Sequence, residues 1–276
     1  MSFSFTGAAA IYKREMMRAF RTVYQSILAP VLTTSLYFIV FGGAIGSRMP
    51  DIGGVDYAAF IIPGLLMLTL LGETTSNSSF GIYMPRFTGT IYELLSAPIG
   101  VAETLIGFVG AAATKSLILA AIILTTASFF VEFEIKYPLF ALGYIVLVAA
   151  SFSLFGFILG IWADSFEKLG IIPVLILTPL TFLGGTFYSL DMLPAPWNTI
   201  ALLNPIAFLV SGLRWTFYGT SDVSIAVSLA LTLGFLALCT GVIAFIFKTG
   251  WRLREYGLRP NGPSQKPCDR WHLSSA

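Results

Sequence analysis

Long apolar stretches that carry few charges dominate the chain and predict membrane-spanning helices. Each is long enough, at 1.5 Å per residue, to cross a hydrocarbon core about 30 Å thick. The six stretches are Thr22–Ser47, Tyr57–Pro85, Thr104–Val131, Tyr137–Ala163, Leu169–Leu190 and Val223–Phe247. A seventh apolar stretch, Met192–Leu213, contains prolines, asparagines and a glycine that make a poor spanning helix. We therefore predict six spans, with a re-entrant or surface-lying helical element between the fifth and the sixth.

The first 24 residues show a different, amphipathic pattern. A helix here would place Tyr12, Met16, Phe20 and Val23 on one face and Arg14, Arg18 and Arg21 on the other. We expect it to lie on an anionic cytoplasmic leaflet, although it could simply be a positive flank that orients the first span. The chain then divides into this helix (1–24), a six-helix membrane domain (25–254) and a polar, Pro-rich tail (255–276) that we expect to be disordered.

Composition and charge agree with an all-α membrane protein. Hydrophobic residues make up 56% of the chain and charged residues 11%, and the mean hydropathy is +0.83. A soluble domain carries about 25% charged residues. With six spans, twelve Lys and Arg residues fall on the side of the termini and three, Arg48, Lys136 and Arg214, on the other. The positive-inside rule then predicts that both termini are cytoplasmic.

The sequence offers few residues that could form a catalytic or metal-binding site. The two cysteines, Cys239 and Cys268, have no metal-binding spacing, and the one histidine, His272, lies close to the end of the chain. The stretch 110–116 imitates a phosphate-binding loop, but Thr114 stands where glycine must precede the lysine. We expect no metal, no directly bound cofactor, no ATP site and no enzymatic activity in this chain.

One segment, Leu177–Arg214, carries a specific family resemblance. Its marked positions are Pro179, Gly184, Gly185, Tyr188, Leu193, Pro194, Trp197, Asn204, Pro205 and Arg214. They resemble the signature region of type-2 ABC exporter permeases, bacterial membrane subunits that export lipo-oligosaccharides, O-antigen and some drugs. The resemblance extends over Ile11–Arg254. It implies that the segment forms an outer gate, built from Gly184, Gly185, Tyr188, Pro194, Trp197, Asn204, Pro205 and Arg214.

A second family-like segment is the inner loop 86–98. Its sequence predicts a short helix with an apolar edge at Leu94 and Leu95, and in the resembling family such a helix docks on the ATPase. With the N-terminal helix it gives a candidate ATPase-coupling surface: Arg86, Gly89, Glu93, Leu94, Leu95, Pro98, Arg14 and Arg18. The alternative is an ordinary amphipathic loop that rests on the lipid headgroups.

Glu73 and Lys115 are the only charges well inside the predicted spans. Such a charge costs about 2.5–3.5 kcal/mol on insertion scales, so each needs a partner or water. Glu73 and Lys115 lie at the same depth when each is counted from the outer end of its span. We hypothesise that they pair or jointly line a vestibule. The alternative is that each side chain snorkels separately to the inner headgroups. The polar run Glu73–Ser79 cannot face lipid, and it either lines a substrate path or bonds to other helices. Glycines 156 and 160 permit close helix approach.

The resulting functional expectation is the membrane subunit of an ATP-driven exporter in a bacterial inner membrane. The resemblance implies two ATPase subunits, which would bind ATP and Mg, and two copies of the permease; the absence of an internal repeat fits a homodimer. The 14% share of aromatic residues makes an amphipathic or lipid-linked substrate plausible, and we expect no nucleic-acid partner. One alternative is an ion- or proton-coupled carrier that uses Glu73 and Lys115. An intramembrane transferase is another, but only loop carboxylates, at 132/134 and 164/167, lie close in sequence.

Overall fold

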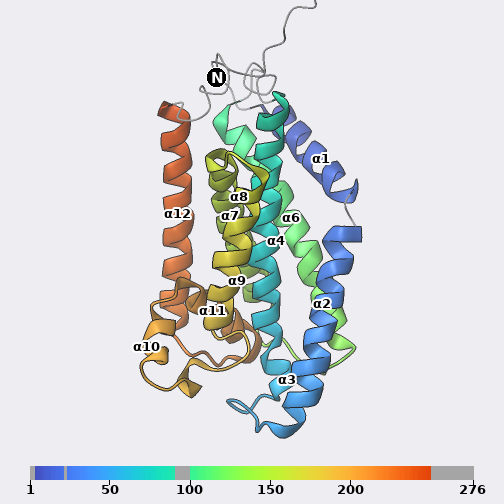
Figure 1. Ribbon diagram of the computed structural model, residues 1–276, viewed down its shortest axis with the longest axis vertical. Coiled ribbons are helices and arrows are strands. Elements are labelled where there is room, and N and C mark those ends of the chain that lie inside the picture. The colour runs from blue at the N-terminus through green and yellow to red at the C-terminus, as the bar shows by residue number, and fades with distance from the viewer. Residues whose placement is uncertain (1–3, 22–23, 91–99, 250–276) are drawn as a thin grey trace, which may run out of the picture.

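The computed structural model describes residues 4–21, 24–90 and 100–249, and about four-fifths of this part of the chain is helical. The helices run side by side as one elongated bundle (Figure 1). The extended pairing found among the described residues is an isolated bridge between Ile52 and Val55. The predicted class, an all-α membrane protein, is confirmed.

Five helical stretches of the described chain are long and apolar enough to cross a membrane. They are Tyr57–Thr88 (α3, Tyr57–Phe60, with α4, Ile62–Thr88), α6 (Val101–Ser128), α7 (Pro138–Trp162), Phe166–Leu183 (α8, Phe166–Ile171, with α9, Thr178–Leu183) and α12 (Ile225–Thr249). The first predicted span is a shorter apolar helix, Ala29–Ile45, in which α2 (Ala29–Tyr37) continues as a π-helical segment. It extends along the same bundle as the other five (Figure 1).

Local sequence explains where the helices stop. Gly89 ends α4 with φ +79°, a left-handed conformation that favours glycine, and its N–H bonds to the carbonyl of Arg86. The fifth span ends at Leu183 rather than at Leu190 as predicted. The reason is the Gly184-Gly185 pair, because Gly185 adopts φ +84° and turns the chain away from the helix axis.

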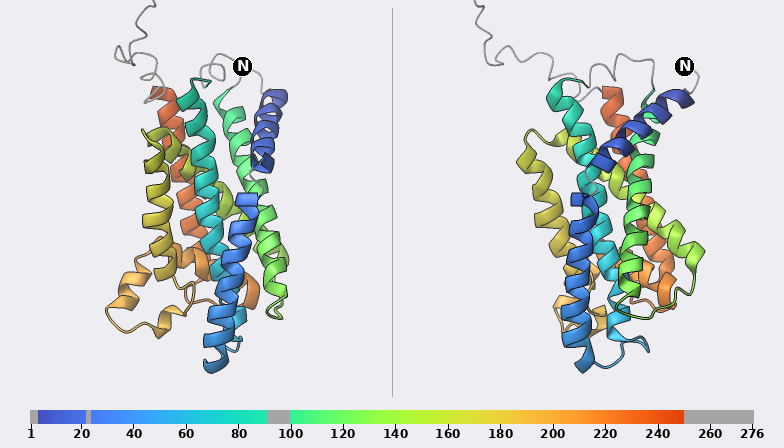
Figure 2. Two further views of the ribbon diagram at one scale, coloured as in Figure 1. Left: turned by 45° about the vertical axis from the view of Figure 1, so that its right-hand side comes forward. Right: turned by 90° about the vertical axis from the view of Figure 1, so that its right-hand side faces the viewer.

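Successive spans alternate in direction, so α1 (Phe5–Arg21) and the end of α12 lie at the same end of the bundle (Figure 2). Residues 184–224, here called the re-entrant segment, stay at the opposite end and do not cross the bundle (Figure 1). The segment contains a 3₁₀ turn (Leu190–Met192), α10 (Trp197–Leu202) and α11 (Pro205–Tyr218). The predicted interruption between the fifth and sixth spans is therefore present.

Helix α4 is the centre of the bundle and packs most closely against α7. A Cβ added at Gly156 would overlap the carbonyl of Thr75, and one at Gly160 would overlap that of Ser79. The two glycines of α7 thus let the backbones of α4 and α7 touch. The close approach that these glycines permit joins helices within one chain.

The N-terminal helix α1 packs obliquely along α6 (Figure 2). Its buried residues are Ala8, Ile11 and Glu15, whereas Phe20, which we expected on an apolar face, is 64% exposed. The predicted division into an apolar and a basic face is wrong at Arg18, which turns toward the bundle. A buried glutamate on the contact face, which binds Arg18, explains the difference. The described helix ends at Arg21.

Candidate functional site

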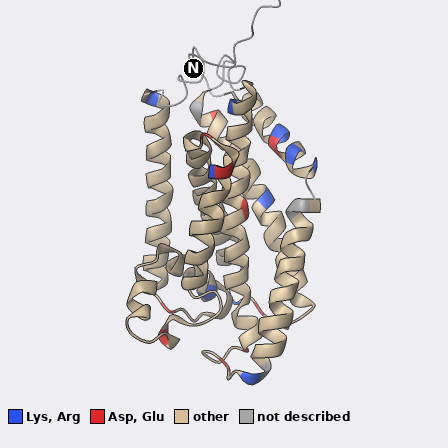
Figure 3. Cartoon of the chain, viewed as in Figure 1, with Lys and Arg blue, Asp and Glu red and all other residues tan. Residues whose placement is uncertain are grey.

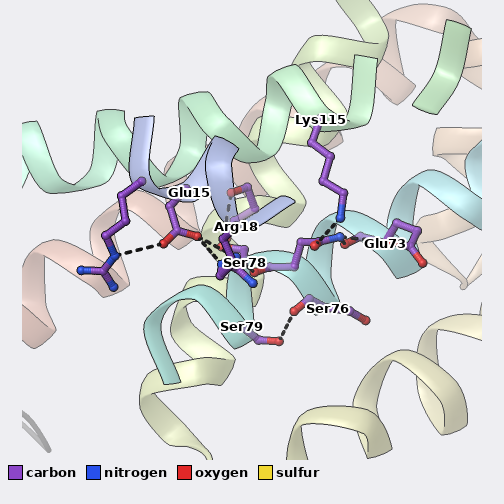
Figure 4. Close-up of polar contacts among 10 residues, drawn as sticks. Glu15, Arg18, Glu73, Ser76, Ser78, Ser79 and Lys115 are labelled. Carbon is purple, nitrogen blue, oxygen red and sulfur yellow. Dashed lines mark hydrogen bonds and ion pairs between the residues drawn. The ribbon is translucent and has the colours of Figure 1, made fainter. Parts of the chain in front are cut away.

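A cluster of polar side chains joins α1, α4 and α6 in the half of the bundle nearer the termini (Figure 4). We call Glu15, Arg18, Glu73, Asn77 and Lys115 the polar cluster. Arg18 Nη2 donates to Glu15 Oε2 at 2.6 Å and to the main-chain carbonyl of Asn77 at 3.1 Å. The N-terminal helix is thereby bonded to the backbone of the central span.

Asn77 bridges the two intramembrane charges. Its Oδ1 accepts from Lys115 Nζ at 2.5 Å, and its Nδ2 donates to Glu73 Oε2 at 3.1 Å. Glu73 and Lys115 lie on neighbouring helices and are joined through this amide. The cluster also borders a small pocket of about 20 Å³ that Phe108 and Ala111 help to line.

The polar run that follows Glu73 bonds largely to other helices. Thr74 shares a 2.6 Å hydrogen bond with Ser116 of α6, and Ser78 donates to the carbonyl of Ser153 in α7 at 2.6 Å. Thr74 and Ser78 are both buried. Of the two interpretations of this run, the geometry favours interhelical hydrogen bonding.

Arg86, predicted to contact an ATPase, is buried at the end of α4. Its Nη1 donates to the carbonyls of Gly160 and Ile161, at the end of α7 nearer the termini. A cation is favourable there, because the helix dipole is negative at a C-terminus. Arg86 therefore fastens α4 to α7. The predicted coupling residues Glu93, Leu94, Leu95 and Pro98 lie outside the described residues.

The re-entrant segment is built around α11, whose residues from Ile206 to Phe217 are mostly buried. Asn204 caps the helix: its Oδ1 accepts from the N–H of Ile206 at 3.0 Å, and its Nδ2 donates to the carbonyl of Leu180. Pro205 then occupies the first helical position, where its missing N–H costs nothing. The Asn-Pro pair both starts α11 and ties it to α9.

Arg214, on α11, is among the largest fully buried side chains of the described chain. Its Nη1 lies 2.7 Å from Asp222 Oδ2, its Nη2 donates to the carbonyl of Gly185 at 2.6 Å, and its guanidinium stacks 3.9 Å from the ring centre of Phe60. Burial lowers the pKa of Arg214 to about 10 and the Asp222 carboxylate opposes this shift, so the guanidinium stays charged at neutral pH. The pair lies near the end of the re-entrant segment, and through the carbonyl of Gly185 it is tied to the start of the same segment.

The other predicted gate residues are divided between the interior and the surface. Gly184 and Gly185 are buried, and a side chain on Gly184 would crowd the backbone of Ala207. Tyr188 donates its hydroxyl to the carbonyl of Leu183 at 3.1 Å. The carbonyl of Pro194 accepts the first N–H of α10, that of Trp197, whose side chain is 55% exposed.

The re-entrant segment is also bonded to the start of the central span. Tyr57 donates its hydroxyl to the carbonyl of Phe187 at 3.0 Å, and Tyr218 donates to the carbonyl of Ala59 at 2.7 Å. A Cβ added at Gly64 of α4 would overlap the backbone of Thr186. Thus α4 contacts the re-entrant segment at one end and the polar cluster at its middle.

Sequence reasoning missed three members of these sites. Asp222 was not selected because a carboxylate in a polar loop gives no sign of a partner eight residues earlier. Glu15 was hidden among the basic residues of α1, and Asn77 within a run of small polar residues. A buried cation needs a counter-charge, so Arg214 itself was the available signal for Asp222.

Comparison with known proteins agrees with this architecture. Residues 6–218 match the family model of the ABC-2 type transporter. The chain is 35% identical over 246 residues to the inner membrane transport permease YadH of Escherichia coli K12, covering 89% of this chain and 96% of YadH. It is 23% identical over 252 residues to nodulation protein J of Rhizobium leguminosarum bv. trifolii, covering 91% and 94% of the two chains. The chain therefore belongs to the ABC-2 type transporter family, whose members are the transmembrane subunits of ABC transporters.

Proposed function

We propose that this chain is the membrane subunit of an ATP-driven exporter in a bacterial inner membrane. Two copies would enclose the translocation path between them, and two separate ATPase subunits would bind ATP and Mg. The family match over residues 6–218 supports a permease role, and the name of the relative YadH supports the inner membrane. We expect an amphipathic or lipid-linked substrate.

Charge supports an orientation with both termini in the cytoplasm. By their positions in the helices, the basic residues of α1, Arg86 near the end of α4 and Lys168 in α8 fall toward the end of the bundle that holds α1, whereas Arg48, Lys136 and Arg214 fall toward the other. Figure 3 shows how Lys and Arg are distributed over the described chain. Cytoplasmic loops carry the excess of Lys and Arg. The re-entrant segment would then face the outside, as an outer gate requires.

The observation that carries the coupling proposal is the bonded connection from α1 to the middle of α4. Arg18 is held by Glu15 within α1 and bonds to the backbone of Asn77 in α4. A second tie, from the hydroxyl of Tyr12 to Thr114 Oγ1 at 3.1 Å, joins α1 to α6. An ATPase that moved α1 and the 86–98 loop would therefore move α4 and α6 with them.

Helix α4 can carry this motion to the outer gate. It is bonded to α7 by Arg86 at its last turn and to α1 and α6 by the polar cluster at its middle. Helix α3, which leads directly into it, is bonded to the re-entrant segment by Tyr57. A tilt of α4 would pull on the turn that contains Gly185 and Phe187. In this mechanism α4 and the elements bonded to it have two states, and closure of the ATPase favours the state in which the gate is open.

Co-purification of the full chain from its native membrane tests the exporter proposal. We expect a soluble P-loop ATPase at about equal stoichiometry. Glu15→Gln, which weakens the hold on Arg18, should keep ATPase binding but reduce transport per ATP hydrolysed. Glu134→Gln, the same change at an exposed position at the other end of the bundle, should leave both unchanged. A protein that arrives alone and transports without ATP would instead support a carrier that uses Glu73 and Lys115.

Separate variants test the gate. Asn204→Ala, Pro205→Ala and Arg214→Lys should each abolish export while the ATPase still binds, because the contacts that they remove lie at the far end of the bundle. Folded yield is measured alongside, so that a loss of protein is not mistaken for a closed gate. Normal export by all three variants would show that the gate assignment is wrong.

A further inference from the structure

An apolar groove opens between α7, α11 and α12 at the end of the bundle that holds the re-entrant segment. Its volume is about 440 Å³, within the range of ligand-sized pockets. Its walls are apolar side chains from all three helices: Leu139, Phe140, Leu147, Trp215, Ile225 and Leu229. Leu139 and Phe140 are strongly exposed, so the groove is open on one side.

Glycine leaves the floor of this groove empty. Gly143 of α7 lines it, is exposed, and would meet no atom within 4 Å if it carried a Cβ. The one phenol in the lining, that of Tyr144, points between the helices, 3.5 Å from both the carbonyl of Phe208 and the hydroxyl of Thr232. The groove therefore offers space and hydrocarbon contact, with its polar groups directed elsewhere.

Aromatic and charged side chains lie beside the groove, where the chain enters α7. Tyr137 and Trp215 stack with their ring centres 4.9 Å apart, and Phe140 meets Trp215 edge-to-face at 6.3 Å. The exposed Lys136 places its ammonium 5.7 Å from the ring centre of Tyr137. The main chain here is fixed, because the N–H groups of Lys136 and Tyr137 donate to Phe217 and Thr216 of α11. Aromatic side chains beside a lysine are typical of a membrane–water boundary.

We propose that this groove binds an acyl chain of one phospholipid from the leaflet at that end of the bundle, with the lipid phosphate at Lys136. Two of its walls, α7 and α12, are long and apolar enough to cross a membrane. Along α7 the lining extends from Leu139, three residues after Lys136, to Leu147, about 12 Å further into the span at 1.5 Å per residue. A single cation above an apolar channel matches a phosphate above an acyl chain, and this charge complementarity favours a lipid over a second copy of the protein.

Native mass spectrometry of the purified full chain with phosphatidylglycerol tests the proposal. Gly143→Leu fills the floor and should weaken binding of one lipid at least tenfold, since each buried methylene of an acyl chain contributes about fourfold. Lys136→Ala should weaken it about fivefold, the effect of one lysine near an anionic surface. The matched controls are Gly234→Leu, an exposed glycine of α12 that does not line the groove, and Arg48→Ala, an exposed cation at the same end. Both should bind as the wild type does.

Photo-crosslinking of the unmodified protein gives a second test that does not depend on a variant folding. A phosphatidylglycerol with a diazirine in its acyl chain should label residues 139–147 and 225–229. Labelling spread evenly over the bundle would overturn the proposal, as would equal lipid binding by Gly143→Leu and Gly234→Leu. A change of oligomeric state in Gly143→Leu, with lipid binding unaltered, would show that the groove is a protein interface instead.

Discussion

Arg214 and Asp222 form an ion pair of 2.7 Å in a part of the fold that is nearly closed to solvent, and each partner also holds a different piece of the chain. Arg214 donates to the carbonyl of Gly185, while Asp222 accepts the hydroxyl of Ser189. The pair thus joins α11 and the loop after it to the turn that follows α9. The re-entrant segment is held as one unit, which a gate that moves as a body requires.

Breaking this pair on one side should be costly. We expect Arg214→Met to lower the free energy of unfolding by about 3–5 kcal/mol, because it leaves the carboxylate of Asp222 buried without its cation. The double variant Arg214→Met/Asp222→Leu removes both charges and should lose less than Arg214→Met alone. Chemical unfolding in detergent micelles measures the difference. A double variant as unstable as the sum of its single changes would show that the two residues do not act as a pair.

The cap of α11 allows two functions of one side chain to be separated. Asn204→Ala removes both the acceptor for Ile206 and the donor for Leu180, and it should destabilise the protein by about 1–2 kcal/mol. Asn204→Asp keeps an acceptor at the helix N-terminus, where a negative charge is favourable, but loses the donor to Leu180. We expect its stability, measured by thermal unfolding, to fall between those of the wild type and Asn204→Ala. Equal stability of the two variants would mean that the cap contributes nothing.

Two glycines on one helix should respond in opposite directions to the same substitution. A Cβ at Gly156 would overlap the backbone of Thr75, so Gly156→Ala should force α4 and α7 apart at a cost of about 1–3 kcal/mol. At Gly143 no atom lies within 4 Å, and Gly143→Ala should gain about 0.5–1 kcal/mol from helix propensity. Thermal unfolding of both variants in the same detergent decides the matter. The prediction is wrong if Gly156→Ala is as stable as Gly143→Ala.

The spans could be predicted because an apolar run shows where hydrocarbon surrounds a helix. Predicted and observed ends agree within about three residues for α6, α7 and α12. The fifth span was predicted to continue to Leu190 because no charged residue occurs between Lys168 and Asp191. Hydropathy does not register the backbone conformation of Gly185, which turns the chain there. Composition therefore located the helices, and local backbone geometry decided where this one stopped.

The candidate sites were harder to predict, because their partners are distant in sequence. Arg18 was predicted to lie on a basic face toward an anionic leaflet, yet its bond to the carbonyl of Asn77 spans 59 residues. Arg86 looked like an exposed charge at a membrane surface, but the end of α7 buries it. In both cases a carbonyl or carboxylate from another element decides the position of the side chain. Helical periodicity describes one helix and cannot supply that partner.

The amide of Asn77 leads to a prediction about Glu73 and Lys115. Asn77 uses the donor and the acceptor of one amide to bind the two side chains. If the amide flips, so that its oxygen and nitrogen exchange places, it can bind the same pair of charges in exchanged positions. Glu73→Lys alone sets two cations around Asn77, and Lys115→Glu alone sets two carboxylates there. The double variant Glu73→Lys/Lys115→Glu restores opposite charges. It should recover about 1–2 kcal/mol relative to the sum of the single losses, measured as unfolding free energy in micelles.

Two controls show whether Asn77 is the reason for this recovery. Glu73→Lys combined with Arg48→Glu pairs the same substitution with a cation at the far end of the bundle, and the two effects should simply add. In an Asn77→Leu background the charge swap should lose its recovery, because no amide remains to join the two side chains. Recovery that persisted in that background would mean that Glu73 and Lys115 attract each other directly and that the Asn77 amide is not needed for their interaction.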